Sequence, residues 1–98
     1  MKLENMTSPN GNKVANQFII TRKTSEHGRE EVFQSYNSVI AKREYYTNAL
    51  GEKITLDSHF WDYSATTGKY RNQFLGEKIA ETRAKIESGE YILANLNK

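Results

Sequence analysis

The chain has 98 residues, 37% of them hydrophobic, and a formal net charge of +2. This length suffices for one domain with a thin core and leaves little material for an enclosed active site, while the lack of Cys excludes disulfides and zinc-ribbon sites. The charge is weaker than that of a dominant nucleic-acid binder, and the lack of a signal-peptide core or a membrane-length apolar run predicts a soluble protein of the cytoplasm.

The first segment, residues 1–13, is predicted to be a flexible tail. It contains the run SPNG (8–11), a turn-forming composition with nothing to bury. Residues 14–98 are then expected to form a single small domain, and removal of the tail is expected to cost little stability.

The domain is predicted to begin with a strand in VANQFIITR, which is rich in β-branched and aromatic residues. Alternation along this strand places Phe18 and Ile20 on one face and Gln17 and Thr21 on the other. The sequence therefore predicts a half-buried strand.

Two or three further strands are expected. EVFQSY (31–36) resumes the alternation after a Gly-containing turn, and SVIAKRE (38–44) either continues that strand through a bulge or forms its own. KITLD (53–57) follows a second turn signal and alternates again. Together these segments predict an antiparallel meander of three or four strands.

The periodicity then changes to that of a helix. Thr67, Tyr70 and Phe74 are spaced by three and four residues, which places them on one side of a helix. Ser64, Thr66 or Thr67 is expected to cap its start.

The apolar stripe of this helix continues as far as Ile86. Gly76 either divides it into two short helices or lies within one long helix, and Gly89 is expected to end it. EYILANL (90–96) follows as a last strand or a docked tail. The fold class predicted is α+β: the meander followed by one long or two short C-terminal helices packed on one sheet face.

A first candidate site is SATTGKYR at the start of the helix. It combines the hydroxyls of Ser64, Thr66 and Thr67 with the cations Lys69 and Arg71, where unpaired backbone N–H groups favour an anion such as phosphate. The alternative is that a hydroxyl only caps the helix while the cations are solvated. The spacing does not match GxxxxGK[ST], so a nucleotide-binding P-loop is not expected.

Four aromatic residues interleave with these two cations: Trp61, Tyr63, Tyr70 and Phe74. Aromatic faces beside cations bind exposed bases with little sequence preference. Trp61 and Phe74 are also the bulkiest side chains available to the core, and packing is the alternative for these two.

A second basic and aromatic cluster combines Lys42 and Arg43 with Tyr45 and Tyr46. It lies near a predicted strand end. A sheet edge protected by charges explains it as well as a binding site does.

DSHFWD offers Asp57, His59 and Asp62 as metal ligands. A metal-assisted hydrolase needs such ligands to converge on one point. In an extended segment only Asp57 and His59 share a face, and a third ligand that joins them there is not evident in the sequence. We therefore expect no catalytic residue, no metal and no cofactor, and we do not expect an enzyme.

FQSYNSVIA, then ITLD, then WDYSATTGKYRNQFL resemble a pattern in small phage-encoded proteins, found especially in phages of Gram-positive bacteria. The matching positions are Ser35, Tyr36, Ile40, Ala41, Tyr63, Ser64, Thr66, Thr67, Phe74 and Leu75. Tyr70 departs from the pattern, since His is expected there in many relatives. The resemblance implies a phage accessory protein made in a bacterial cytoplasm, of a family with no agreed activity.

Two functions follow as expectations. The first is a non-catalytic phage accessory protein that engages a host component, for example as an anti-defence (anti-CRISPR-type) inhibitor, and the second is direct nucleic-acid binding through a local basic and aromatic patch. No membrane partner is expected. The candidate binding residues are Tyr36, Lys42, Arg43, Tyr63, Ser64, Thr66, Thr67, Lys69, Tyr70 and Arg71.

Overall fold

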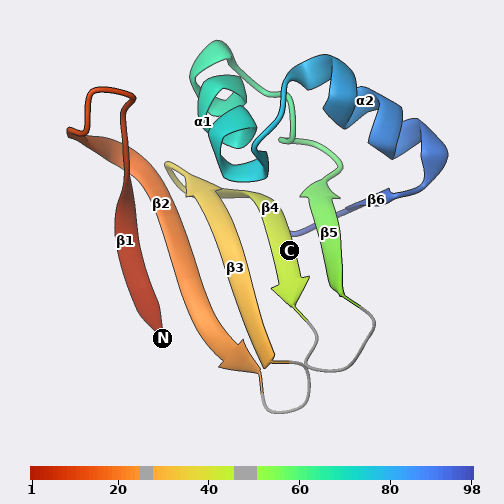
Figure 1. Cartoon of the computed structure of the whole chain (residues 1–98), viewed down its shortest axis with the longest axis horizontal. Helices are drawn as coiled ribbons and strands as arrows, with labels where there is room; N and C mark the ends of the chain where they lie inside the picture. The colour runs from red at the N-terminus through yellow and green to blue at the C-terminus, as the bar shows by residue number, and fades with distance from the viewer. Residues whose placement is uncertain (25–27, 46–50) are drawn as a thin grey trace.

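The computed structural model describes residues 1–24, 28–45 and 51–98, in which six strands form one mixed sheet and two short helices lie beside one end of it (Figure 1). The strands lie in the sheet in chain order, and each neighbouring pair is antiparallel except β5 and β6, which are parallel. The elements are β1 (Lys2–Thr7), β2 (Lys13–Thr24), β3 (Gly28–Ser35), β4 (Ser38–Tyr45), β5 (Glu52–Asp57), α1 (Ala65–Leu75), α2 (Ile79–Ser88) and β6 (Tyr91–Ala94).

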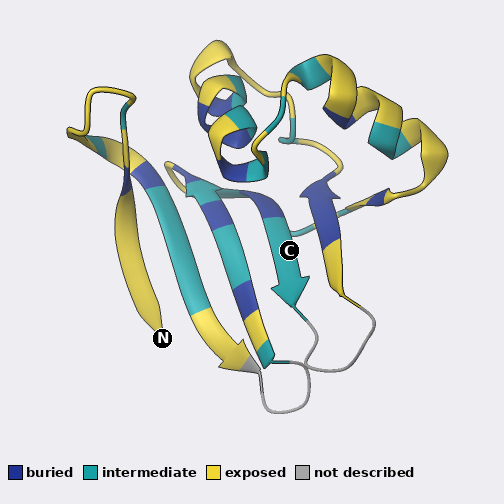
Figure 2. Cartoon of the chain, viewed as in Figure 1, coloured by how far each residue is buried: buried dark blue, intermediate teal, exposed yellow. Residues whose placement is uncertain are grey.

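The prediction of an antiparallel meander of three or four strands is wrong, because the described sheet also contains β1 and β6. β1 lies where the sequence predicts a flexible tail, and it pairs antiparallel with β2. Its residues are exposed except for Met6, which enters the core (Figure 2). An edge strand with one buried side chain carries no apolar alternation, and the sequence pattern therefore does not reveal it.

β6 is parallel to β5 because the chain returns to the sheet through both helices. A parallel pair needs a crossover of a dozen residues or more, which residues 58–90 supply. The buried carboxylate of Glu77 secures this return, because it accepts hydrogen bonds from the Tyr91 hydroxyl and Lys85 Nζ, both at 2.8 Å. Burial raises the pKa of Glu77, but hydrogen bonds from Lys85, Thr82 and Tyr91 outweigh it and hold the pKa below its usual value.

The core lies between α1 and the sheet. The rings of Phe33 on β3 and Phe74 on α1 stack with their centroids 5.9 Å apart. α1 ends at Gly76, whose left-handed backbone (φ 71°) allows the chain to turn before α2. The buried apolar residues are Met6, Phe33, Ile40, Ala41, Ile54, Leu56, Tyr70, Phe74 and Tyr91.

One face of β2 points toward the helices, and the other points toward the open side of the sheet. Gln17 is fully buried and pairs with Ser35, whose hydroxyl lies 3.3 Å from that of Thr67 on α1. Phe18 and Ile20 alternate with Gln17 and are half-buried on the opposite face. The alternation predicted which residues share a face, but Phe18 and Ile20 lie on the face that points away from α1.

We expect Met6→Ala to lower the free energy of unfolding by about 2 kcal/mol, because a buried Met side chain is lost from the core. For a chain of this size the melting temperature should fall by about 10 °C. Leu3→Ala is the matched control on the same strand, since Leu3 is exposed, and it should have little effect. Equal, small effects of both changes would contradict the packing of β1.

Candidate functional site

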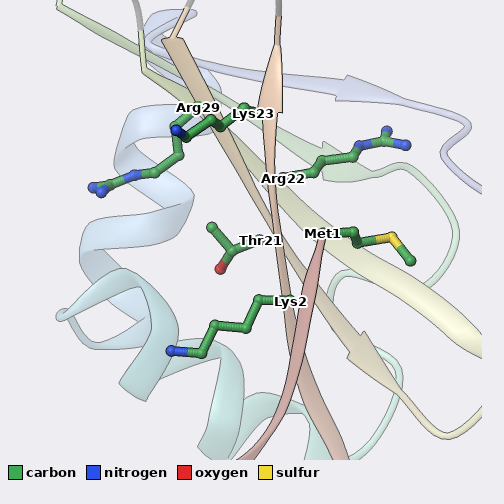
Figure 3. Close-up of a pocket in the computed structure, with 6 residues that line it drawn as sticks. All are labelled: Met1, Lys2, Thr21, Arg22, Lys23 and Arg29. Atoms are coloured by element: carbon green, nitrogen blue, oxygen red, sulfur yellow. The ribbon is translucent and has the colours of Figure 1, made fainter.

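A hollow of about 420 Å³ lies at the β1 end of the sheet, where four cations line it together with Met1 and Thr21 (Figure 3). We call Lys2, Arg22, Lys23 and Arg29 the basic groove. Lys2 and Arg29 point to one side of the strands, and Arg22 points to the other. Arg22 forms an ion pair with Glu30, and Lys2 Nζ lies 3.7 Å from a carboxylate oxygen of Glu4. These contacts partly neutralise the groove.

A second, smaller pocket of about 170 Å³ opens where three segments meet: the β3–β4 turn, the loop after β5 and the first turn of α1. Four hydroxyl side chains and three aromatic rings line it. We call it the tyrosine pocket, and its lining residues are Ser35, Tyr36, Ser38, Ile40, Phe60, Tyr63, Ser64 and Thr67.

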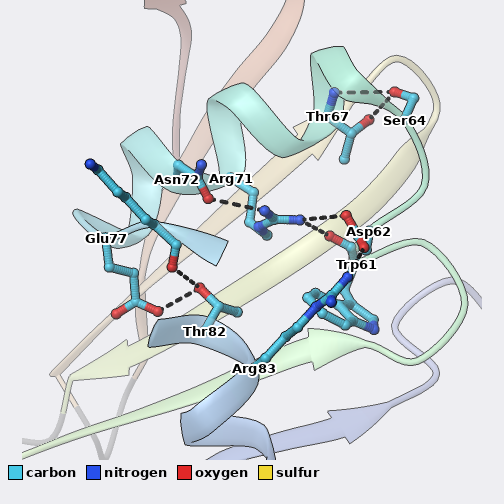
Figure 4. A network of polar contacts seen from close by, with 10 residues as sticks. Trp61, Asp62, Ser64, Thr67, Arg71, Asn72, Glu77, Thr82 and Arg83 are labelled. Carbon is cyan, nitrogen blue, oxygen red and sulfur yellow. Dashed lines mark hydrogen bonds and ion pairs between the residues drawn. The ribbon is translucent and has the colours of Figure 1, made fainter. Parts of the chain in front are cut away.

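Hydroxyl groups that hydrogen-bond to one another hold α1 against β3 at this pocket. Ser64 caps α1, because its Oγ accepts a hydrogen bond from the Thr67 N–H at 3.2 Å, and it donates one to Thr67 Oγ1 at 3.1 Å (Figure 4). The buried Thr67 Oγ1 also lies 3.3 Å from Ser35 Oγ. Of the residues that the sequence offers as caps, Ser64 performs the role.

Tyr36 stands on the rim of the pocket in a constrained turn. It is 58% exposed and has a left-handed backbone with φ 55°, which is uncommon for a residue other than Gly. Its N–H donates to the carbonyl oxygen of Asn16 at 2.7 Å, and its carbonyl oxygen accepts from Gln34 Nε2 at 2.8 Å. These contacts on both sides fix the backbone that presents the exposed ring.

Tyr63, on the other side of the rim, is 68% exposed and packs edge-to-face on Phe60 with the centroids 5.4 Å apart. The loop that carries both rings is anchored by Asp57. One carboxylate oxygen of this buried residue accepts from the N–H groups of His59 at 3.0 Å and Phe60 at 2.8 Å, and the other accepts from the Leu96 N–H at 2.7 Å.

The electrostatics of Asp57 agree with an anchoring role. Burial raises its pKa, but the hydrogen bonds from Leu96, Phe60, Asn97 and His59 outweigh burial and leave the pKa below its usual value. Asp57 therefore stays ionised and occupied by backbone donors. This arrangement does not support the alternative that Asp57 binds a metal.

Arg71, a candidate phosphate contact, is 1% exposed and points into the protein (Figure 4). Its guanidinium donates to the carbonyl oxygen of Trp61 at 2.9 Å, to Asp62 at 3.1 Å and to Asn72 Oδ1 at 3.0 Å. It also lies 5.4 Å from the centre of the Trp61 ring. Arg71 thus joins α1 to the loop before it and is inaccessible to a ligand.

The second predicted cluster is divided between the two faces of the sheet. Arg43 lies on the helix face, where it donates to the carbonyl oxygen of Phe74 at 2.9 Å and to Glu31 at 3.3 Å. Lys42 alternates with it on the opposite face and lies 3.7 Å from Glu44. Tyr46 lies outside the described residues.

The remaining candidates on α1 do not converge on the pocket. Thr66 and Lys69 are exposed, and Tyr70 is buried in the core with Lys69 Nζ 5.4 Å from its ring centre. The structure therefore brings together four of the predicted binding residues, namely Tyr36, Tyr63, Ser64 and Thr67. Ser35, Ser38, Ile40 and Phe60 complete the pocket, and no sequence signal pointed to Ser38 or Phe60.

Among the residues that the structure describes, no three His, Asp or Glu side chains gather where they could hold a metal ion. None of the helices described there has the length and apolar character needed to cross a membrane.

Residues 1–91 match a family described as "Family of unknown function (DUF8033)". No curated protein and no solved structure matches the chain. The match covers every described strand and helix except the last three residues of β6 and the segment after it.

Proposed function

Since the chain belongs to this family of unknown function, we propose from its geometry that the protein is a non-catalytic binding protein and that the tyrosine pocket is the surface that engages a partner protein. The observation that carries the proposal is the pair of exposed rings, Tyr36 and Tyr63, on opposite sides of a pocket lined with hydroxyls. Tyr is enriched among the residues that contribute most binding energy in protein interfaces.

The rigidity of the pocket supports this proposal. Tyr36 is held by backbone contacts to β2, and Tyr63 rests on a loop that the Asp57 carboxylate anchors. Rings fixed in this way lose little conformational freedom on binding, so more of their contact energy appears as affinity. A 170 Å³ pocket between them is large enough for one side chain of a partner.

We extend the proposal to the kind of partner through the sequence resemblance. Six of the residues that carry the resemblance to small phage proteins line the tyrosine pocket: Ser35, Tyr36, Ile40, Tyr63, Ser64 and Thr67. A phage accessory protein in a bacterial cytoplasm would use this surface on a host component, and a host defence nuclease is the example that the resemblance favours.

Direct nucleic-acid binding is the second candidate, and the basic groove is the observation that favours it. Lys23 near the end of β2 and Arg29 at the start of β3 add positive charge next to Lys2 and Arg22. These strand ends lie at the opposite end of the sheet from α1 (Figure 1). Phosphate contacts of this kind make binding strongly dependent on salt. The patch first predicted for this role is not available, because Arg43 and Arg71 are used in internal contacts.

A paired set of variants tests these proposals. Tyr36→Asn combined with Tyr63→Ala removes both rings, and Asn tolerates the positive φ at position 36. We expect this variant to fold normally and to bind a host protein at least about tenfold more weakly, since each interface Tyr contributes more than about 1 kcal/mol. The measurement is affinity capture from bacterial host lysate with and without nuclease, followed by titration of the captured protein.

Lys69→Ala is the control, because Lys69 is exposed on α1 and does not line the pocket. Lys23→Ala with Arg29→Ala tests the second candidate by binding to short DNA across a salt series. The second proposal would replace the first if nuclease treatment removed the captured partner and only the basic-groove variant failed to bind it.

A further inference from the structure

β1 is the outermost strand of the described sheet, and among the described strands it pairs only with β2. Backbone N–H and C=O groups on the free side of such a strand are available to another strand. Leu3 is the second residue of this strand and is 62% exposed. We propose that two copies of this chain associate through β1, with the strands antiparallel about a two-fold axis at Leu3.

The charges on β1 select this register. About a two-fold axis perpendicular to the sheet, residues that lie directly opposite one another carry their side chains on the same face. Because side chains alternate between the faces, the two residues of a pair are both even-numbered or both odd-numbered, and the sum of their numbers is even. With Leu3 opposite Leu3 of the second copy, Lys2 of each copy lies opposite Glu4 of the other. Shifting the axis by one residue in either direction places Lys2 opposite Lys2 or Glu4 opposite Glu4, and like charges directly opposite are destabilising.

The apolar residues of the open sheet face favour the same register. Leu3 pairs with Ile20 of β2, and Ile20 pairs with Val32 of β3, so the three side chains form one row across the sheet. Ile20 and Val32 are half-buried. In the proposed dimer the row continues directly into the same row of the second copy, and both Leu3 side chains lose part of their contact with water.

The interface is short, since residues 1–5 of each copy overlap in this register. It is smaller than a standard protein interface, and a weak dimer with a dissociation constant of about 10 µM to 1 mM is expected. Sedimentation equilibrium of the whole chain from about 10 µM to about 2 mM covers this range. A monomer at every concentration, or growth into assemblies larger than a dimer, would overturn the proposal.

Disulfide trapping tests the register. The chain has no Cys, so Leu3→Cys introduces a single thiol that lies opposite its equivalent at the two-fold axis. Asn5→Cys is the matched control on the same face, because its two copies would be about 13 Å apart along the strands. Under mild oxidation we expect Leu3→Cys to give about ten times more covalent dimer than Asn5→Cys, since a disulfide needs its Cβ atoms within about 4.5 Å. Equal trapping would contradict this register.

Charge exchange supplies an independent test. Lys2→Glu or Glu4→Lys alone creates two like-charged pairs across the axis, and each should weaken the dimer about tenfold. The combination of both changes restores the opposite charges in exchanged positions and should return the dissociation constant to within about threefold of the wild-type value. Failure of the combined variant to recover would exclude the Lys2–Glu4 pairing.

Discussion

Phe74→Ala is expected to lower the free energy of unfolding by about 3–5 kcal/mol, which is a large part of the stability of a domain this small. Phe74 is buried, its ring stacks on Phe33, and the Arg43 guanidinium lies 4.7 Å from its ring centre. Its removal leaves a cavity between α1 and the sheet. Urea unfolding followed by circular dichroism measures the change.

Lys69→Ala is the control on the same helix, and it should change stability by less than about 0.5 kcal/mol because Lys69 is exposed. A Phe74→Ala variant that is as stable as the wild type but has lost partner binding would assign Phe74 to the recognition surface and would contradict its place in the core.

Arg71→Ala is expected to destabilise the fold by about 3 kcal/mol, in the range measured when one partner of a buried ion pair is removed. The change leaves the carbonyl oxygen of Trp61 without this donor, leaves Asp62 with only the Arg83 guanidinium at 3.3 Å, and removes the contact with the Trp61 ring. Because the Asp62 side chain is 36% exposed, water can partly replace the lost contact, which places the effect at the lower end of the range. Thermal and urea unfolding give the value.

Arg71→Met separates packing from charge, since Met retains much of the volume beneath Trp61 and should cost less than Ala. If Arg71→Ala left stability unchanged and weakened DNA binding with a reduced salt dependence, Arg71 would be an accessible phosphate ligand. That result would restore the original interpretation of SATTGKYR as an anion site.

Several features of the fold follow from local patterns in the sequence. The spacing of Thr67, Tyr70 and Phe74 predicted a helix that buries this side, and all three are buried on α1. Gly89 was expected to end a helix and Gly76 either to divide one or to lie within it, and each lies in a left-handed conformation after a helix. Such features depend on neighbours within one turn of the chain, so residue type and spacing are enough to predict them.

The two sheet edges were predicted less well, since β1 was expected to be a flexible tail and β6 was left as either a last strand or a docked tail. β1 buries only Met6, and β6 is a four-residue strand whose central Ile92 and Leu93 remain exposed. Neither has the apolar alternation that marks a strand with one buried face. The backbone hydrogen bonds of β1 go to the next strand along the chain, β2, whereas those of β6 go to β5 across residues 58–90, a partner that only the assembled sheet supplies.

The sequence by itself determined which residue types could form a site around the start of α1: hydroxyls, aromatic rings and cations in one short stretch. Only the tertiary structure decided which of them face outward. Tyr63 and Tyr36 come together from segments 27 residues apart, whereas Arg71, seven residues after the N-cap Ser64, turns inward to Asp62. The direction of a long side chain depends on the partners packed around it, and for Arg71 these partners come from the loop after β5 and from Asn72 on α1.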